Sequence, residues 1–470
     1  MDNFFDNFRP IRNTFRKLNL WDVLEKLYKI NRRNNKTVLP EIIEFIYLNS
    51  IIYSPDYINI KLKNPEFEWN KLLRQSNDFQ SMIDKHIIEK KGFDFLYKFM
   101  LNQLKSNTNH YHLHLYRYYY IFSNAVLSEH FFKLKGISFL DFYTCAMWIH
   151  SKFDKKTYVI DKSYFLRKAN DNTTFSIKNV SQTLDILSTD LHTLKLNLKQ
   201  QLRYDSNAFI THEYEHIKKP IFESNEKLYC LFPDNLLYQY TAGIYYIAEV
   251  YDYKHKLNNV FGDSFECYVG EVLKKNQSKN MTITKEISFN RNQNKTSDWI
   301  IQDEESVAFI ECKTKRLKII SKKYEDISES DISSLVDAIV QVFKVFHHYR
   351  NGDIKELKYN SKKLFIPIIV TLEEWFAGFI INDDNIINRV KSNLRILNID
   401  EKLIDKYKLH VISISKFETD IQIIKELGFK EYYKRVENGN LNIDDFETVS
   451  FFSKEIDDVI LTPLEKQFLK

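Results

Sequence analysis

The sequence predicts an α+β protein, in which a mainly helical first half precedes a smaller region where helices and strands alternate. Apolar residues recur at spacings of three and four through most of residues 1–204, which is the period of an amphipathic helix. Glycine occurs only 9 times in 470 residues, where average usage gives roughly 33. From residue 259 onward, short apolar runs bounded by turn-forming residues alternate with helical stripes, which predicts an α/β core.

Four parts are expected along the chain. Residues 1–204 form a helical region for recognition or assembly, 205–258 a connecting hairpin and helix, 259–420 the α/β core, and 421–470 a helical tail. In the first part, one helix is expected to carry a stripe of five leucines, Leu184, Leu187, Leu191, Leu194 and Leu198. The stripe covers barely two heptads, so packing within its own domain is favoured over pairing of two chains, and a homo-oligomer stays open.

The connecting part contains two short apolar runs and one helical pattern. Residues 220–222 and 228–233 resemble a small hairpin, and a helix is expected from Leu236 to Val250.

In the core, the expected order is helix, three strands, helix, strand. The helices cover residues 262–273 and 331–349, and the first strand covers 281–289. Two further strands, ending at Ile301 and Lys313, flank an acidic, turn-prone link of hairpin length. The last strand, 364–370, is apolar on both faces, although Pro367 indicates an edge or a bulge.

Three polar residues of this predicted hairpin carry the chemistry. Asp298 begins one strand, and Glu311 and Lys313 end the next, on the same face because side chains alternate. Two carboxylates and an ammonium therefore converge at one sheet edge. Mg²⁺ prefers hard oxygen ligands of this kind and keeps several waters, and Mn²⁺ is expected to substitute for it.

These residues and the order of elements resemble the PD-(D/E)xK nuclease superfamily, which has a restriction-endonuclease-like αβββαβ core. Asp298 matches the first acid of the motif, Glu311 the second and Lys313 the lysine, whereas Ser297 stands where the name-giving proline would be. The resemblance covers only the C-terminal part of the chain. It implies a Mg²⁺-dependent endonuclease that hydrolyses phosphodiester bonds of DNA and leaves a 5′ phosphate and a 3′ hydroxyl.

The family often adds a glutamate from the preceding helix. Glu266 borders the packed side of that helix and is the expected third metal ligand and catalytic residue, whereas Glu271 lies beside lysines on a solvated face. Gln341, on the helix after the Glu-x-Lys strand, is an auxiliary candidate or an exposed helix glutamine. Lys313 would position the attacking water and accept its proton if nearby metal charge lowers its pKa.

A basic run follows the catalytic strand directly. Lys315, Arg316 and Lys318 are the expected phosphate contacts, with a solvated loop as the alternative. DNA is the expected partner, and RNA is left open. A nuclease fused to a helical module resembles bacterial anti-phage defence or restriction-type effectors.

Three alternatives remain. The chain can be a nucleic-acid-binding or assembly protein with an inactive nuclease fold. His212 and His216 match the HExxH pattern of zinc hydrolases, but Pro220 ends any helix one turn later. The run from Tyr116 to Tyr120, which includes Arg117, can stack on bases, although a packed helix face is favoured.

Composition sets the expected environment. The net charge is +5, too small to identify a polyanion partner for the whole chain. The four cysteines have neither zinc-site spacing nor a secreted framework, so a reducing compartment is expected. The N-terminus lacks the pattern of a signal peptide, and no apolar run has the length of a membrane span. A cytoplasmic protein without membrane contact is the expectation.

Overall fold

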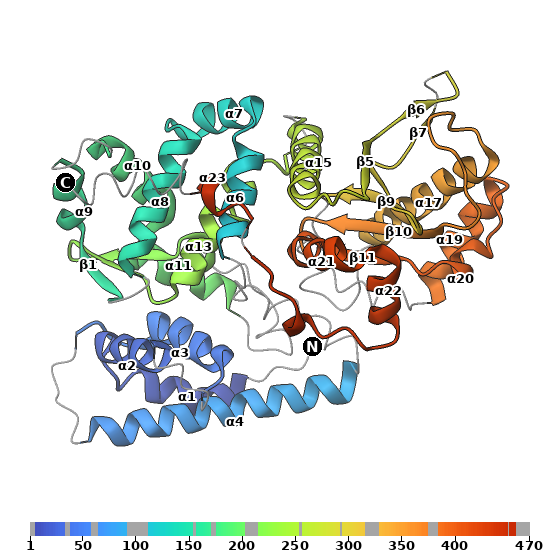
Figure 1. Ribbon diagram of the computed structural model, residues 1–470. Coiled ribbons are helices and arrows are strands. Elements are labelled where there is room, and N and C mark those ends of the chain that lie inside the picture. Colours follow the sequence, from blue (N-terminus) through green and yellow to red (C-terminus); the bar gives the residue numbers. More distant parts are fainter. Residues whose placement is uncertain are drawn as a thin grey trace.

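The structure is a computed structural model, and it describes most of the chain. The described residues are 5–32, 38–57, 64–91, 111–153, 157–170, 175–202, 215–252, 256–291, 294–314, 329–374, 384–449 and 451–456. They confirm an α+β protein with a helical N-terminal region (Figure 1). Among these residues, no helix has both the length and the apolar character needed to span a membrane.

The first four helices form a small unit with its own hydrophobic cluster, drawn in blue in Figure 1. They are α1 (Phe5–Phe15), α2 (Leu20–Arg32), α3 (Pro40–Tyr53) and α4 (Pro65–Lys91). α3 is apolar on nearly every side, and Ile42 through Ile52 are almost all buried, because it lies at the centre of the unit. Leu194, Leu198, Phe222 and Leu231 of the next part complete the cluster.

The second helical part includes a four-stranded sheet with the order β1-β4-β3-β2. Its helices are α6 (Tyr111–Phe122), α7 (Ala125–Lys135), α8 (Phe139–Phe153), α9 (Lys162–Asn170), α10 (Ile177–Leu187), α11 (Leu191–Gln201), α12 (Glu215–Lys218), α13 (Pro233–Tyr240) and α14 (Ile244–Ile247). Its strands are β1 (Val159–Asp161), β2 (Ser188–Asp190), β3 (Ile221–Ser224) and β4 (Lys227–Tyr229). β3 and β4 pair antiparallel, so the small hairpin expected in the connecting part is confirmed.

Two expected helices of these parts are each divided. The leucine stripe is divided between α10 and α11, because the short strand β2 separates the two helices. Asp190 caps the second helix by accepting a hydrogen bond from the Thr193 amide. Its members Leu184, Leu187, Leu194 and Leu198 are buried, so the stripe packs within the chain. The helix expected from Leu236 to Val250 is α13 and α14, separated at residues 241–243.

The C-terminal part contains a five-stranded sheet with the order β11-β10-β9-β8-β5. Its strands are β5 (Thr282–Lys285), β8 (Trp299–Gln302), β9 (Ser306–Lys313), β10 (Leu364–Thr371) and β11 (His410–Ser413). β5, β8 and β9 are antiparallel neighbours, whereas β9, β10 and β11 are parallel. With α15 (Leu257–Lys275) before β5 and α17 (Glu329–Asn351) between β9 and β10, the expected order of helix, three strands, helix and strand is present.

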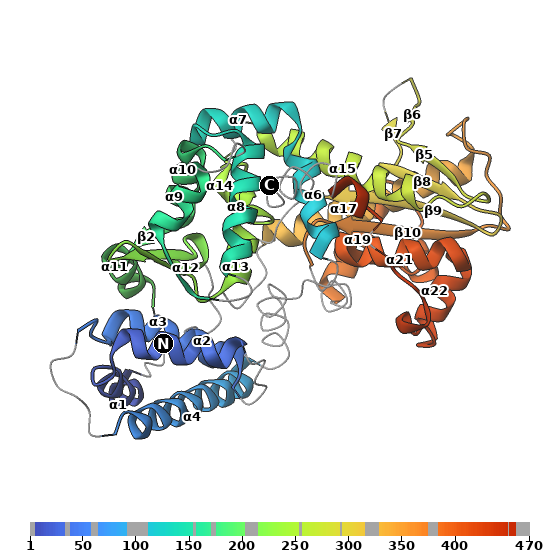
Figure 2. The same cartoon turned by 60° about the vertical axis from the view of Figure 1, so that its left-hand side comes forward.

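One insertion distinguishes the first strand from the expected one. The run 281–289 is not a single strand, because after β5 the chain leaves the sheet and forms a hairpin of β6 (Ser288–Phe289) and β7 (Asn294–Lys295). This hairpin projects beyond the sheet in both views (Figures 1 and 2).

Pro367 does not place β10 at an edge, which corrects the sequence expectation: β10 lies between β9 and β11. The amides of Leu364 and Leu372 donate to carbonyls on the β9 side, so even-numbered residues of β10 point their amides toward β9 and odd-numbered ones toward β11. Pairing with β11 begins only at Ile368, so the nitrogen of Pro367 faces a position where β11 has not yet started. No ladder hydrogen bond is lost there.

Each face of the sheet has its own helical cover. One face packs against α15 and α21 (Ile414–Leu427), and the other against α17 and α19 (Asp384–Ile396). α20 (Leu403–Lys406) precedes β11, and α22 (Phe429–Glu437), the 3₁₀ helix Ile443–Asp445 and α23 (Ser453–Ile456) follow α21. Helical segments are thus present in the expected tail, as far as residue 456.

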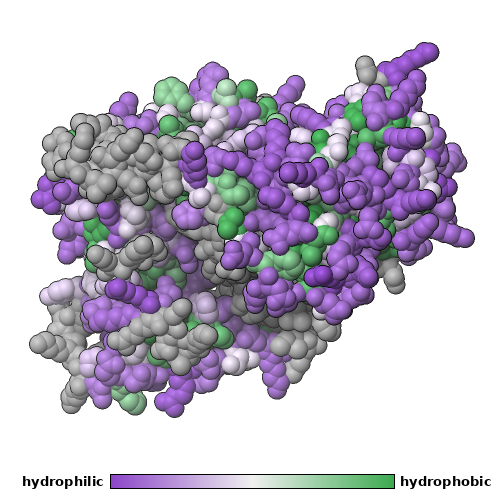
Figure 3. Space-filling model, in the orientation of Figure 1, coloured by the Kyte–Doolittle hydropathy of each residue, from purple (hydrophilic) through white to green (hydrophobic). Residues whose placement is uncertain are grey.

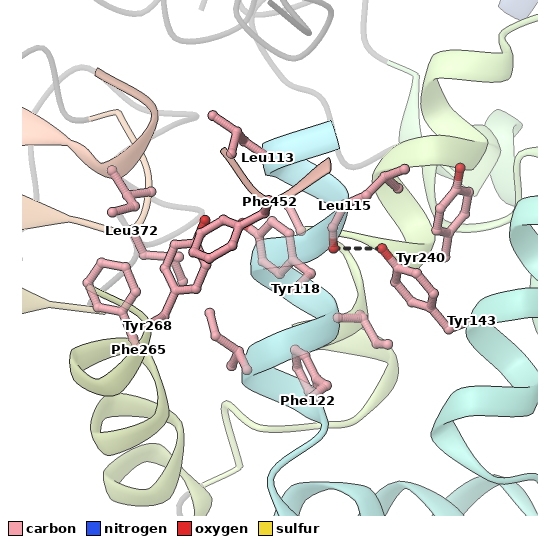
Figure 4. Packing of buried hydrophobic residues seen from close by; sticks show 14 of the residues in the cluster. Leu113, Leu115, Tyr118, Phe122, Tyr143, Tyr240, Phe265, Tyr268, Leu372 and Phe452 are labelled. Carbon is pink, nitrogen blue, oxygen red and sulfur yellow. Dashed lines mark hydrogen bonds between the residues drawn. The ribbon is translucent and has the colours of Figure 1, made fainter. Parts of the chain in front are cut away.

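The helical part and the sheet share one hydrophobic core. Figure 4 shows α6 between the two: Leu115, Tyr143 and Tyr240 lie on one side, and Phe265, Tyr268 and Phe452 on the other. The ring of Phe452 stacks on Tyr116 with centroids 4.3 Å apart, so the end of the described chain packs back onto α6. Because this core contains residues from 113 to 456, the expected boundaries at 204, 258 and 420 do not separate hydrophobic cores.

Candidate active site at one edge of the five-stranded sheet

Strand direction brings one end of each of the five strands to the same edge of the sheet. β9, β10 and β11 are parallel, so their carboxyl ends meet there. β8 is antiparallel to β9, so its beginning lies at that edge, and β5 ends there because it is antiparallel to β8. The residues next to these ends are Glu286, Asp298, Glu311 and Lys313.

β9 carries Glu311 and Lys313 on the face covered by α17. Val307 and Phe309 belong to the cluster with α17, and side chains alternate along a strand, so Glu311 and Lys313 follow on that same face. The Lys313 Nζ donates to Glu311 Oε1 at 2.6 Å. The Glu311 side chain is only 2% exposed, whereas that of Lys313 is 34% exposed.

Asp298 lies beside Glu311 because Trp299 pairs with Ile310 in the antiparallel register. Its Oδ2 accepts a hydrogen bond from the Cys312 amide at 2.6 Å, which fixes the carboxylate next to β9. The antiparallel pairing of β8 with β9 therefore places both acids of the expected motif at adjacent positions.

Glu266 reaches this region from α15 through its packing on Trp299. The indole nitrogen of Trp299 donates to the Glu266 carbonyl oxygen at 3.0 Å. The indole ring also occupies the space over Gly270, where a Cβ would lie 2.2 Å from the ring. The absence of a side chain at Gly270 therefore leaves the space beside Glu266 that Trp299, the first residue of β8, occupies.

The carboxylates influence one another electrostatically. Burial and then the charge of Asp298 raise the pKa of Glu311 from 4.5 to about 8. Burial likewise raises the pKa of Asp298. Burial and Asp298 raise the pKa of Glu266, against the effect of Lys285, whose Nζ lies 3.5 Å from Glu266 Oε1.

Lys313 remains a cation in this arrangement. Burial alone lowers its pKa, but the adjacent Glu311 raises it above the ordinary value. In the metal-free chain Lys313 is therefore a charged hydrogen-bond donor, and its use as a proton acceptor depends on positive charge brought in by a metal.

Glu286 is a carboxylate that sequence reasoning missed. Its amide donates to the Asp298 carbonyl oxygen at 2.9 Å, and its charge raises the pKa of Glu266, Asp298 and Glu311. Its own side chain is paired with Lys295 at 2.8 Å. The feature that could have identified Glu286 is its position directly after the first strand. That position is recognisable only when the strand is known to end at Lys285.

The donor set suits a hard divalent cation. Glu311 Oε2 is buried and has no hydrogen-bond partner among the described residues, which is a costly arrangement that a cation would relieve. Within the described ranges, no three acidic, histidine or cysteine side chains lie close enough together to enclose a metal ion. Mg²⁺ commonly uses one or two carboxylates and completes its shell with water and substrate phosphate, so Asp298 and Glu311 fit it.

The remaining candidates differ in what the structure shows of them. Glu271 is in a surface ion pair with Lys274 at 2.8 Å, as expected for a solvated face. Gln341 is partly buried on α17. Lys315, Arg316, Lys318 and His212 lie outside the described residues, so the structure does not place them.

His216 and the run from Tyr116 to Tyr120 have packing partners within the fold. The buried His216 Nε2 lies 2.8 Å from Glu44 Oε1, and its ring packs against Tyr47 and Phe232. Arg117 is buried in an ion pair with Glu418, and Tyr118 is buried in the core, which corrects the alternative that this run stacks on bases.

Comparisons with protein-family models, with curated proteins and with solved structures find no match for this chain. A functional assignment therefore depends on the chemistry of the site itself.

Proposed function

We propose that this protein is a Mg²⁺-dependent endonuclease that hydrolyses phosphodiester bonds of DNA. The single observation that carries the proposal is the environment of the buried Glu311, which lies beside Asp298. Among the described residues, one of its carboxylate oxygens has no hydrogen-bond partner, and Lys313 is the only cation paired with the other. An arrangement of one buried and two partly buried carboxylates with raised pKa values at a sheet edge is typical of a functional site.

The residues have separate roles in this proposal. Asp298 and Glu311 hold the metal, and Glu266 contributes a third carboxylate directly or through water. A bound Mg²⁺ would supply a lowered pKa of water and stabilisation of charge on the scissile phosphate. Lys313 orients the attacking water and balances the negative charge that develops on the phosphate, because it enters the site as a cation. The hydrogen bond from the Cys312 amide keeps Asp298 oriented.

The decisive experiment compares Asp298→Asn and Glu311→Gln with Glu271→Gln on linear and supercoiled duplex DNA. Glu271 is a matched control, because it is a glutamate on α15 in a surface ion pair. We expect cleavage with Mg²⁺ or Mn²⁺, loss of cleavage with EDTA, loss in the two site variants, and full activity in the control. End-labelling should find 5′ phosphates.

Metal binding has a readout that does not need activity. Mg²⁺ should raise the thermal unfolding midpoint of the wild-type protein, with about 2.7 kcal/mol of stabilisation at a hundredfold excess over Kd. Glu311→Gln should respond much less. DNA binding without cleavage, together with no response to Mg²⁺, would instead favour a nucleic-acid-binding protein with an inactive nuclease fold.

A zinc hydrolase finds little support. The Glu44 contact and the aromatic packing already account for the buried His216. Stoichiometric zinc that is lost in His216→Ala would reverse this conclusion.

A further inference from the structure

The β6–β7 hairpin is built directly onto the strands that carry the site. The Ile287 amide donates to Thr296 Oγ1 at 2.8 Å, and the Thr296 amide donates to the Ile287 carbonyl at 3.0 Å. Further in, one residue along the first strand and two along the second, Glu286 and Asp298 are joined by a backbone hydrogen bond of 2.9 Å. The base of the hairpin is therefore adjacent to two acidic residues of the candidate site.

The hairpin is anchored by an aromatic contact on α17. Phe289 is 5% exposed, and its ring meets the His348 ring edge-on with centroids 5.2 Å apart. The ion pair of Lys295 with Glu286 ties the other strand to the site edge. These contacts hold the base of the hairpin beside Asp298.

The outer part of the hairpin is basic and rich in amides. Residues 288–297 contain no acid, and the stretch 290–295 reads Asn-Arg-Asn-Gln-Asn-Lys. Asn290, Arg291 and Lys295 are exposed. Asn290 and Arg291 have φ angles of 50° and 55°, a left-handed conformation that is uncommon for arginine. Figure 3 shows a hydrophilic surface where the hairpin projects.

We propose that this hairpin enters the major groove of duplex DNA, with Arg291 and Asn290 toward the base edges and Lys295 toward a phosphate beside the site. The inference deepens the proposed function and rests on it. The major groove of B-form DNA is wide enough for a two-stranded β-ribbon, and arginine and asparagine are the side chains that bind guanine and adenine edges there.

The composition of the hairpin favours this partner over others. Its one apolar residue, Phe289, is buried against α17, so no apolar side chain of residues 288–297 is available as the anchor that a protein partner needs. An exposed aromatic ring for stacking on single-stranded bases is absent from residues 288–297 for the same reason. A-form RNA has a deep and narrow major groove that does not admit the ribbon.

The test measures binding to a short duplex across a salt titration, in the full chain made inactive by Glu311→Gln. Arg291→Asn keeps a residue that tolerates the left-handed conformation and removes the charge, and Lys295→Gln removes the phosphate contact. Lys430→Gln is the matched control, because Lys430 is an exposed lysine paired with Glu305, at the opposite end of β9 from the site.

We expect Arg291→Asn to weaken duplex binding at least about tenfold, with unequal losses on different sequences. Lys295→Gln should weaken binding to all DNA sequences alike, and it should reduce the slope of log K against the logarithm of the salt concentration by about 0.9. Lys430→Gln should stay within about twofold of its parent. Binding of the single strand and of the RNA duplex should be insensitive to Arg291→Asn.

Two results would overturn the inference while the wild-type protein still cleaves DNA, so that the proposed function stands. In the first, neither hairpin variant changes duplex binding. In the second, the variants lose the same amount of affinity for duplex DNA, duplex RNA and single strands. A wild-type protein that neither binds nor cleaves DNA would overturn the proposed function itself. Thermal unfolding of each variant verifies the fold, which changes of exposed side chains should leave intact.

Discussion

Two buried glutamates, Glu418 and Glu311, have the same exposure and opposite surroundings. Each side chain is only 2% exposed. Glu418 accepts hydrogen bonds from Arg117 Nε at 3.1 Å, from Arg117 Nη2 at 2.6 Å and from the Tyr268 hydroxyl at 2.7 Å. Glu311 accepts one from Lys313, and its second oxygen has no partner among the described residues.

The difference shows that burial of a charge does not by itself mark a functional site. A buried charge is tolerated when a partner and hydrogen bonds replace its hydration. The Arg117 pair joins α6 to α21 and so holds the helical part against the sheet. Glu311 is compensated by Lys313 at one oxygen only, so its site is the one that would gain from a bound cation.

The largest effect is expected from breaking the compensated pair. Arg117→Met should lower the free energy of unfolding by about 3–5 kcal/mol, because it leaves Glu418 buried without its cation. Urea unfolding measures the loss. Adding Glu418→Leu to this variant should restore much of the stability, since the orphaned charge is then removed. A double variant no more stable than the single one would show that the pair is not the cause.

At the partly compensated glutamate the expected effects are reversed. Glu311→Gln should lower DNA cleavage at least about a hundredfold, because a group that acts on the transition state is removed. Its free energy of unfolding should not fall, since the buried carboxylate is replaced by a neutral amide. Parallel cleavage and urea measurements test both parts. If Glu311→Gln lowered the free energy of unfolding by several kcal/mol, Glu311 would be a stabilising buried charge like Glu418.

The sequence predicted the local parts of this contrast better than the distant ones. Asp298, Glu311 and Lys313 lie within 16 positions, and strand alternation and hairpin pairing determine their relation. Arg117 and Glu418 are 301 positions apart, so neither spacing nor periodicity relates them. The tyrosine run beside Arg117 therefore left base stacking open until its packing was known.

Other elements depended on similarly distant contacts. The break of the leucine stripe at residues 188–190 follows from pairing of β2 with β3, which lies more than 30 positions further on. The central place of Pro367 depends on where β11 begins, at His410. Glu286 was missed because its relation to Asp298 arises from a strand that ends one residue before it.

A smaller effect is expected from changing how α15 is placed. Gly270→Ala should destabilise the protein by about 1–3 kcal/mol, because the new Cβ would lie 2.2 Å from the Trp299 ring. The shift of Trp299 should also displace the neighbouring Asp298 and lower cleavage. Gly262→Ala is the control, since among the described residues a Cβ there meets only Thr314 Oγ1, at 3.8 Å. Equal stability of the two variants would exclude tight packing at Gly270.

The pH dependence of stability should distinguish the partly compensated site most directly. The pKa of Glu311 is raised in the folded protein from 4.5 to about 8 by burial and by Asp298, so between these values the folded state holds a proton that the unfolded state has released. The free energy of unfolding must then decrease as the pH rises from about 4.5 to about 8, by at most about 1.4 kcal/mol per pH unit.

Because other groups also titrate, the informative quantity is the difference between Glu311→Gln and the wild-type protein. The variant cannot ionise at this position, so its relative stability should increase with pH through the window and level off above about 8. Saturating Mg²⁺ should reduce the difference, since a bound cation favours the ionised Glu311 of the wild-type protein. A difference that does not change with pH would mean that Glu311 is as well compensated in the fold as Glu418.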